Sequence, residues 1–471
     1  MPATSTNNGS PFTTLTAAFL SWKAVLFAIA AGSRVGSTYD TSSSLLVPDS
    51  PPTFLTRLSS WDAIYFLKAA ERGHLFEQEW AFGSALPKCI SLIIRGNARS
   101  SCPPPAPTLG PKVQALSNHK PSALRIPRLG LLTTPGPGTH LEALVAVIFS
   151  NACHLLSVLV LYQLGLHLWR DSRWALAAAL LHVLSPAGLF LSAPYAESAC
   201  SLLSFTGWLL LVKSCLGTGT SVSSLPRDAL TLLAGLVFGL ATYFRTNALL
   251  NGAPLAFDFL STFYQLTEDL DHRKTPDYLR RLLVLGIAGL LVAGGTVVPQ
   301  YHAYQTYCST ASAPSEPRPW CTHLVPSIFN FVQRQYWNTG FLRYWTLSNA
   351  PLFALAAPML FVMAKAGKDL YFQRSIISSG HGSASGLDSS RLILVARSMV
   401  FAQVLLVVMA FTSYHVQIIT RLSSGYPAWY WWLAACLRSP KTRAMGSGLV
   451  VFMIMYASIQ AVLFASFLPP A

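Results

Sequence analysis

Charged residues are scarce in this chain. Asp, Glu, Lys and Arg make up 11% of its 471 residues, whereas a soluble domain carries about a quarter. Apolar residues instead make up 52% of the chain, and the mean hydropathy is +0.44. This balance predicts an all-α protein that crosses a membrane several times, because long apolar helices are what a bilayer accommodates.

Acidic residues are fewer than basic ones, with 18 Asp and Glu against 33 Lys and Arg, which leaves a net charge of +15. In a membrane protein this excess mostly reports the orientation of the chain, so we infer no nucleic-acid partner. The sequence also lacks a Walker loop, a GxGxxG fingerprint and an HExxH motif. Its eight cysteines show no CxxC spacing, which argues against a structural zinc site, and we expect no metal.

Apolar segments predict eleven membrane-spanning helices in one domain, residues 14–471, which follows a disordered cytosolic tail, residues 1–13. The first segment, from Thr14 to Ala31, is followed by no convincing cleavage site and is typical of an uncleaved signal anchor. Several segments are shorter than the ~20 residues of a straight span, so some could be broken helices. The other ten lie near residues 141–168, 174–192, 198–213, 229–244, 248–266, 279–298, 350–364, 391–413, 424–437 and 446–467.

Lys and Arg are concentrated in alternate short connections between these segments, a pattern that predicts a cytosolic amino terminus. On this topology the long loop 32–140 and the loop 299–349 both face the non-cytosolic side. The first of these loops contains a proline-rich insertion, about 96–140, which includes Cys102-Pro-Pro-Pro-Ala-Pro. Proline interrupts regular structure, so we predict no helix or strand in this insertion.

A stretch of the first loop, about 60–73, predicts an amphipathic helix that lies on the membrane surface. Ser59 or Ser60 is expected to cap its start, and Gly73 to end it. Steps of 100° per residue gather apolar side chains on one stripe. The stripe consists of Ala63, Phe66, Leu67 and Ala70, and the other side carries Trp61, Tyr65, Lys68 and Arg72.

Asp62 lies in the first turn of this helix, at the edge of the apolar stripe. The helix dipole favours its ionised form there. Asp is also common at helix starts, so a purely structural carboxylate is the alternative. Glu71, nine residues further on, lies about half a turn around the helix, so one substrate cannot easily contact both acids.

Further polar positions are expected on the same side of the membrane. Glu197 begins a span, where the helix dipole alone could account for an acid. Arg245, followed by Asn247, lies near bilayer depth, where a charge is costly and therefore a functional candidate, unless it snorkels to the interface. Gln417 and Arg421 are four residues apart and would share a helix face, or else belong to an ordinary hydrated loop.

An interfacial carboxylate with arginines on the face away from cytosolic nucleotides indicates a specific chemistry. Asp62 could take a proton from a sugar hydroxyl, and the arginines could hold the phosphate of a lipid-linked donor. No metal-binding DxD motif occurs near Asp62. A transporter or flippase is the rival interpretation, although the internal repeats common in transporters are not evident in these spans.

Several sequence blocks carry a further indication. They are Ser60 to Gly73, Leu184 to Ser198, Phe238 to Gly252, Arg318 to Cys321, Tyr336 to Trp345 and His415 to Trp431. Each block alone is weakly specific, but together and in this order they resemble the GPI mannosyltransferase 2 family over about 15–95 and 141–437. The proline-rich insertion does not resemble that family.

The resemblance implies a metal-independent, inverting glycosyltransferase of the GT-C architecture, without a cofactor and active on the lumenal side of the endoplasmic reticulum membrane. It implies dolichyl-phosphate mannose as the donor and the mannosyl-glucosaminyl-phosphatidylinositol precursor as the acceptor, joined by an α-1,6 bond. By analogy Asp62 is the candidate catalytic base. The candidates for binding donor or acceptor are Trp61, Tyr65, Glu71, Glu197, Arg245, Asn247, Gln417 and Arg421. The alternative is another dolichyl-phosphate-sugar transferase of the same architecture. A small membrane partner subunit is compatible with the resemblance.

Cys308 and Cys321 lie 13 positions apart in the predicted lumenal loop. In an oxidising compartment such a pair can form a disulfide, and we predict that this one closes the loop. Two free thiols are the alternative, because six other cysteines are present.

Overall fold

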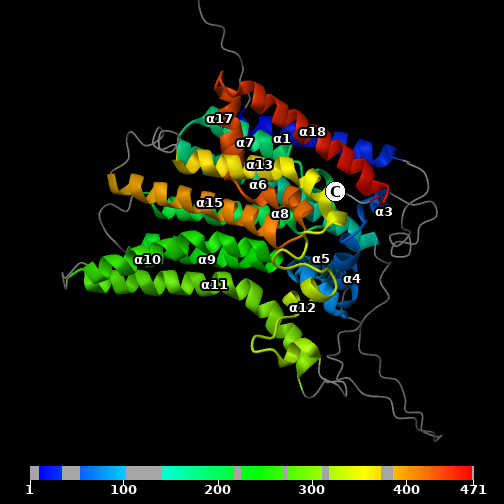
Figure 1. The fold of residues 1–471 in the computed structure, drawn as a ribbon, viewed down its shortest axis with the longest axis horizontal. Helices are drawn as coiled ribbons and strands as arrows, with labels where there is room; N and C mark the ends of the chain where they lie inside the picture. The colour runs from blue at the N-terminus through cyan, green and yellow to red at the C-terminus, as the bar shows by residue number, and fades with distance from the viewer. Residues whose placement is uncertain are drawn as a thin grey trace, which may run out of the picture.

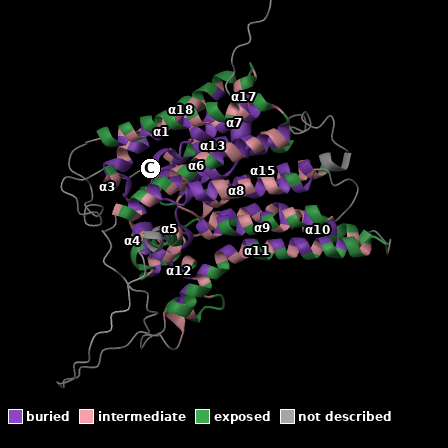
Figure 2. Ribbon diagram, turned by 180° about the vertical axis from the view of Figure 1, so that it is seen from behind, coloured by how far each residue is buried: buried purple, intermediate pink, exposed green. Residues whose placement is uncertain are grey.

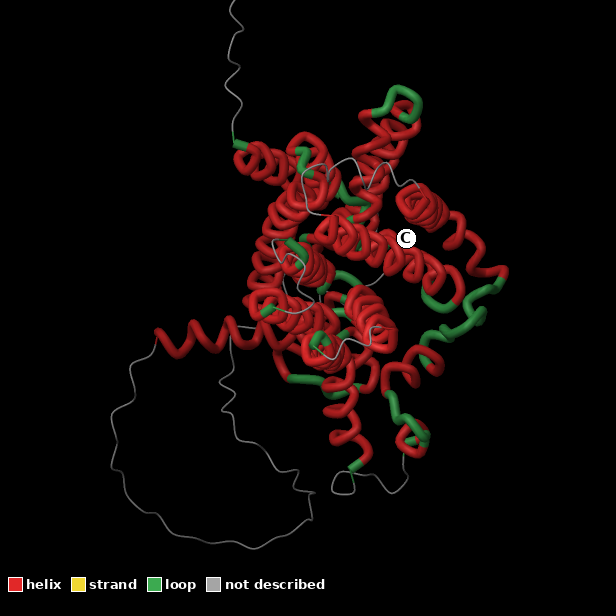
Figure 3. The backbone as a smooth tube through the Cα atoms, turned by 90° about the vertical axis from the view of Figure 1, so that its left-hand side faces the viewer, coloured by secondary structure: helices red, strands yellow, loops and turns green. Residues whose placement is uncertain are grey.

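The structure is a computed structural model that describes residues 10–33, 54–101, 140–216, 224–268, 273–309, 318–372 and 386–468. All of these residues belong to helices or to the loops that join them (Figure 3). The α-helices are α1 (Pro11–Gly32), α3 (Phe54–Leu58), α4 (Ala63–Arg72), α5 (Ala85–Ser101), α6 (His140–Trp169), α7 (Ser172–Val183), α8 (Glu197–Ser214), α9 (Leu225–Phe244), α10 (Ala253–Glu268), α11 (Thr275–Cys308), α12 (Ile328–Gln335), α13 (Ala350–Phe372), α15 (Gly386–Thr412), α16 (Ile419–Leu422), α17 (Ala428–Arg438) and α18 (Arg443–Ala465). Short 3₁₀ helices are η1 (Glu77–Phe82), η2 (Gly188–Leu191), η3 (Thr246–Gly252), η4 (Pro319–Thr322), η5 (Leu347–Asn349), η6 (Val416–Ile418) and η7 (Ser423–Gly425).

The eleven predicted spans all fall on helices, and the prediction of an all-α polytopic membrane protein is confirmed. Seven segments of the described chain, in α1, α6, α9, α11, α13, α15 and α18, are long and apolar enough to cross a bilayer. The other four helices, α7, α8, α10 and α17, have 12, 18, 16 and 11 residues. Twelve helical residues rise only about 18 Å, short of the ~30 Å of a hydrocarbon core, so the count of eleven full spans is not reached.

The long helices lie side by side in a bundle, with α9, α10 and α11 along one edge (Figure 1). Glycines let α9 and α11 approach until their backbones touch. A Cβ added at Gly235 would lie 2.7 Å from the Cα of Ala288, and one at Gly239 would collide with the carbonyl of Leu291. Larger side chains at these positions would force the two helices apart.

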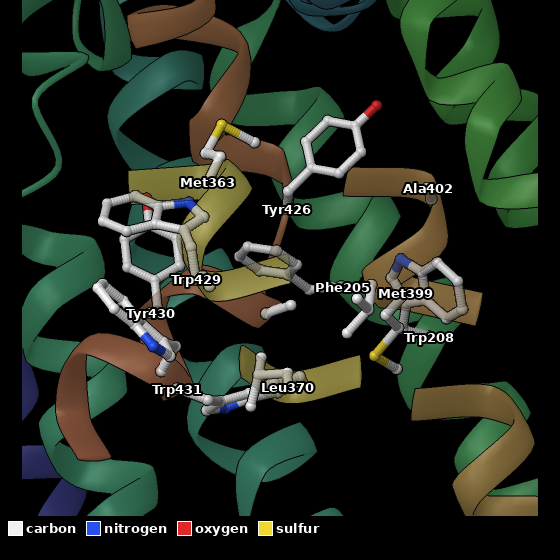
Figure 4. Packing of buried hydrophobic residues seen from close by; sticks show 14 of the residues in the cluster. Phe205, Trp208, Met363, Leu370, Met399, Ala402, Tyr426, Trp429, Tyr430 and Trp431 are labelled. Carbon is white, nitrogen blue, oxygen red and sulfur yellow. The ribbon is translucent and has the colours of Figure 1, made fainter. Parts of the chain in front are cut away.

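The main core lies around the aromatic run of α17. Trp429, Tyr430 and Trp431 are almost completely buried, and Figure 4 shows Phe205 of α8 beside them, with Trp208 of the same helix farther along the cluster next to Met399. The polar side-chain atoms of Trp429 and Tyr430 have partners within the bundle, whereas the indole nitrogen of Trp431 has none among the described residues. The indole of Trp429 donates a 2.9 Å hydrogen bond to a backbone carbonyl of η7.

Helix α4 has the predicted amphipathic character but begins later than predicted. Its first residue is Ala63, with Asp62 at the N-cap position, and Gly73 follows its last residue. The predicted capping role of Ser59 or Ser60 is wrong, because both hydroxyls donate to backbone carbonyls of the preceding helix α3. Trp61, at φ = 59°, turns the chain between the two helices.

The predicted apolar stripe of α4 is confirmed, because Ala63, Phe66, Leu67 and Ala70 are all buried against neighbouring helices. Helix α5 was not predicted. It packs on α4, and it extends to Ser101, into the segment for which no regular structure was expected. The rest of that segment and residues 1–9 of the predicted tail lie outside the described residues.

The loop after α11 is anchored to the first loop. Helix α11 continues through Pro299 to Cys308, whose disulfide with Cys321 confirms the predicted pair, with Cα atoms 5.6 Å apart. Trp320, next to the disulfide, is fully buried, and its indole donates a 2.9 Å hydrogen bond to Glu77 of η1. The disulfide therefore supports the contact between η4 and η1.

Candidate active site

A cavity of about 150 Å³ opens at the end of the bundle where α4, α5 and α12 lie (Figure 1). Its wall is built from α4, η1, the end of α9 with η3, α11, α12 and the segment from Tyr414 to Leu422. Four of the predicted site residues line it: Asp62, Arg245, Asn247 and Arg421. Segments far apart in the sequence thus meet at one site, at one end of the bundle.

Asp62 is the one carboxylate among the lining residues. Its side chain is 33% exposed, and one oxygen lies 3.1 Å from Nη1 of Arg421. The buried stripe of α4 fixes the helix, and the start of the helix then holds this carboxylate at the cavity wall. Asp62 is thus both accessible and oriented by a cation.

Glu197 lies behind the cavity wall, at the first residue of α8, with its side chain 1% exposed. Its Oε1 accepts from Nε of Arg421 at 2.7 Å and lies 2.8 Å from Nη1 of Arg245. One buried carboxylate therefore orients both arginines toward the cavity. Its other oxygen has no hydrogen-bond partner among the described residues.

Arg421 is also enclosed by two aromatic rings that sequence reasoning missed. Its guanidinium carbon lies 4.4 Å from the ring centre of Phe190 and 4.7 Å from that of Tyr195, in the geometry of cation–π contacts. Burial by itself would lower the pKa of Arg421, but the carboxylates of Glu197 and Asp62 outweigh it and raise that pKa above the usual value. Arg421 is therefore a permanently charged and fixed group.

His415 and Asn247 are further polar residues on the cavity wall. Burial lowers the pKa of His415, partly opposed by the charge of Asp62, so the imidazole is neutral at physiological pH. The turn at Asn247 is held by Tyr426, whose hydroxyl donates a 3.1 Å hydrogen bond to the Asn247 carbonyl. The site thus combines one accessible carboxylate, two oriented cations and a neutral histidine.

Comparison with known proteins decides the family. The family described as "Mannosyltransferase (PIG-V)" matches residues 18–103 and 138–471. The chain belongs to this mannosyltransferase family. Proteins named GPI mannosyltransferase 2 are similar to it throughout. The one from Chaetomium globosum is 46% identical, covering 98% of this chain and 96% of its own. The one from Gibberella zeae is 41% identical with 98% of each chain covered, and the one from Aspergillus oryzae 38% identical with 99% and 97% covered.

The predicted resemblance is therefore confirmed, and the chain is a multi-pass membrane glycosyltransferase of GPI-anchor synthesis. The family match omits residues 104–137, which belong to the proline-rich insertion. Among solved structures, the chain is similar to the oligosaccharyltransferase of Archaeoglobus fulgidus, with a TM-score of 0.44 and 13% identity over 95% of this chain and 55% of that one.

Three predicted binding residues of this mannosyltransferase lie away from the cavity wall. Trp61 packs on Phe467, with ring centres 5.0 Å apart, and Tyr65 stacks on Phe82 at 4.7 Å. Glu71 is on the surface, paired with a lysine of its own helix at 2.9 Å. Phe82 lines the cavity, so Tyr65 supports the wall rather than forms it.

Gln417 is also absent from the cavity wall. It lies in η6, and its side-chain oxygen accepts a 3.3 Å hydrogen bond from Tyr344. The predicted helix face shared with Arg421 does not exist, because the chain changes from 3₁₀ to α geometry between the two residues. Within the described ranges, no three His, Cys, Asp or Glu side chains are grouped so as to hold a metal ion.

Proposed function

We propose that this mannosyltransferase transfers the second mannose of the GPI anchor, through an α-1,6 bond, from dolichyl-phosphate mannose to the mannosyl-glucosaminyl-phosphatidylinositol precursor. The reaction takes place on the lumenal side of the endoplasmic reticulum membrane, in a GT-C type, inverting and metal-independent enzyme. The similarity to proteins named GPI mannosyltransferase 2 over nearly the whole chain supports this choice over another dolichyl-phosphate-sugar transferase.

Asp62 is the proposed general base. The observation that carries this assignment is that Asp62 is the accessible carboxylate on the cavity wall, whereas Glu197 is buried behind it and already bound to two arginines. A base must reach the hydroxyl proton it removes. Arg421 orients the Asp62 carboxylate, so that little reorganisation is needed when the acceptor hydroxyl arrives.

The two arginines have the second role in this mechanism. Transfer breaks the bond between the sugar and a phosphate, which leaves readily as an anion and needs no acid. Negative charge therefore builds on the phosphate, and fixed cations stabilise that charge most effectively in a partly buried site. Arg245 and Arg421 line the cavity with side chains 19% and 12% exposed, which suits this task.

The test is Asp62→Asn, assayed in microsomes with labelled dolichyl-phosphate mannose. The amide keeps shape and hydrogen bonding but cannot accept the proton, so turnover falls by about 10²–10⁴ while donor binding is retained. Asp277→Asn, an exposed acid in the first turn of α11, is the matched control and retains full activity. Near-normal transfer by Asp62→Asn excludes it as the base.

A further inference from the structure

A second hollow lies on the outer side of the bundle, between α9 and α11. It is an apolar groove of about 420 Å³, and its lining residues are apolar or glycine except for Tyr243. Leu240 of α9 and Leu290 of α11, which line it, are 45% and 73% exposed. Helix α11 runs along the edge of the bundle (Figure 2), so this groove faces the hydrocarbon of the membrane.

Glycines shape the groove. Gly239 and Gly295 bring the two helix backbones into contact and form its floor. Gly294, next to the floor, faces open space, because a Cβ added there would meet no atom within 4 Å. A narrow channel with glycine on its floor and leucine on its walls suits one extended hydrocarbon chain.

The groove adjoins the catalytic cavity, because Tyr243 and Gly295 line both. Two basic side chains lie near this junction. Lys88 of α5 donates a hydrogen bond to the Tyr243 hydroxyl, with its amino group 5.2 Å from the ring centre, and Arg245 follows two residues later in the chain. At Tyr243 and Gly295 the apolar groove therefore lies next to a cavity that contains cationic side chains. A lipid phosphate requires this arrangement, with apolar surface for its chain and cations for its phosphate.

We propose that the groove between α9 and α11 binds the polyisoprenyl chain of the donor lipid. This inference rests on the proposed function. In the donor, the lipid is joined to the transferred sugar through a single phosphate, so its chain must leave the cavity next to the reacting carbon. In the acceptor, three rings separate the reacting hydroxyl from the lipid phosphate: the mannose that carries this hydroxyl, the glucosamine and the inositol. Its acyl chains therefore enter the membrane farther from the reacting atoms. A groove that begins at the cavity wall therefore fits the donor.

The test fills the groove without touching the cavity. Gly294→Leu places a side chain in the open channel, and Gly289→Leu, at another position of α11 with no atom within 4 Å, is the matched control outside the groove. Each enzyme is assayed with dolichyl-phosphate mannose and with a donor that has only two isoprene units. Gly294→Leu raises the KM for the long donor about tenfold, as expected when about two methylene groups lose their contacts. The KM for the short donor and for the acceptor is unchanged, and Gly289→Leu matches the wild type.

Other outcomes overturn the assignment. An unchanged KM for the long donor in both Gly294→Leu and Leu240→Trp, which fills the groove from α9, shows that the chain does not lie there. A higher KM for the acceptor alone assigns the groove to the acceptor lipid, and an equal loss with both donors means that the cavity was disturbed. Activity with the short donor shows that each variant is folded.

A binding measurement separates this inference from the proposed function. A polyisoprenyl phosphate with a photoactivatable group near its phosphate is crosslinked to the wild-type protein, without any need for turnover. Crosslinks to α9 and α11 in an enzyme that transfers mannose from neither donor refute the proposed function and retain the groove. Crosslinks elsewhere refute the groove.

Discussion

The ion pairs of Glu197 lead to a prediction that can be worked out quantitatively. Its side chain is 1% exposed, and one oxygen contacts both Arg245 and Arg421 at 2.7 to 2.8 Å. Glu197→Gln keeps the shape but removes the charge, which leaves two partly buried cations beside each other. Removing one partner of a buried ion pair costs about 3–5 kcal/mol, so the apparent melting temperature of the purified protein falls clearly.

The origin of this loss can be tested with a double substitution. If the loss comes from uncompensated positive charge, Arg245→Met in the Glu197→Gln background recovers part of it, with a coupling of about 0.5–3 kcal/mol. Glu71→Gln breaks an exposed ion pair whose acid is 43% exposed, and such pairs contribute at most about 1 kcal/mol. The reasoning is refuted if Glu197→Gln is no less stable than Glu71→Gln, or if the effects of the two site substitutions simply add.

Three further predictions concern the arginine, the topology and the loop. Arg421→Ala weakens donor binding as well as turnover. Arg421→Lys restores both only partly, because lysine lacks the planar fork that contacts two carboxylates. Normal kinetics in Arg421→Lys would contradict this. A glycosylation acceptor inserted at Leu324, which is fully exposed, becomes glycosylated and one at Thr275 does not, whereas the reverse pattern would invert the topology. Replacing Cys308 and Cys321 by Ser removes about 3 kcal/mol of chain-entropy stabilisation and makes the loop after α11 more sensitive to protease. Equal protease sensitivity of the variant and the wild type would show that the disulfide does not order this loop.

Local pattern was sufficient for the parts of the fold that local forces decide. The apolar stripe of α4 was predicted from helical period alone, because burial of one face is what holds a short helix in place. The predicted capping by Ser59 or Ser60 was wrong, because a serine hydroxyl can bond to the backbone on either side of it. Here both hydroxyls donate to carbonyls of α3, about one turn earlier. The predicted number of membrane spans was too high for a related reason. Helices α7 and α17 are apolar because they are buried against each other, and not because they cross the bilayer alone.

The candidate site was predicted as a set of polar positions but not as a geometry. Arg245 was identified because charges are rare in apolar surroundings. Asp62 was identified from its position at the edge of the apolar stripe, and Arg421 from its spacing to Gln417. Phe190 and Tyr195 gave no such signal, because buried aromatics are common and their contact with Arg421 spans more than two hundred residues of sequence. The position of Tyr195 two residues before Glu197 was the one local hint. Gln417 was overvalued because spacing was interpreted as a continuous helix.

The bridge between Asp62 and Arg421 has a consequence for how the enzyme is made. These two residues are 359 positions apart in the sequence, and Glu197 and Arg421 are 224 positions apart. A chain still being synthesised inserts its first loop and α8 long before residue 421 leaves the ribosome. Until then, Arg245 is the one of its two observed partners with which Glu197 can pair, and Asp62 lacks its cation. Catalytic competence is therefore acquired late and all at once, so that a prematurely terminated chain that lacks α16 is inert rather than partly active.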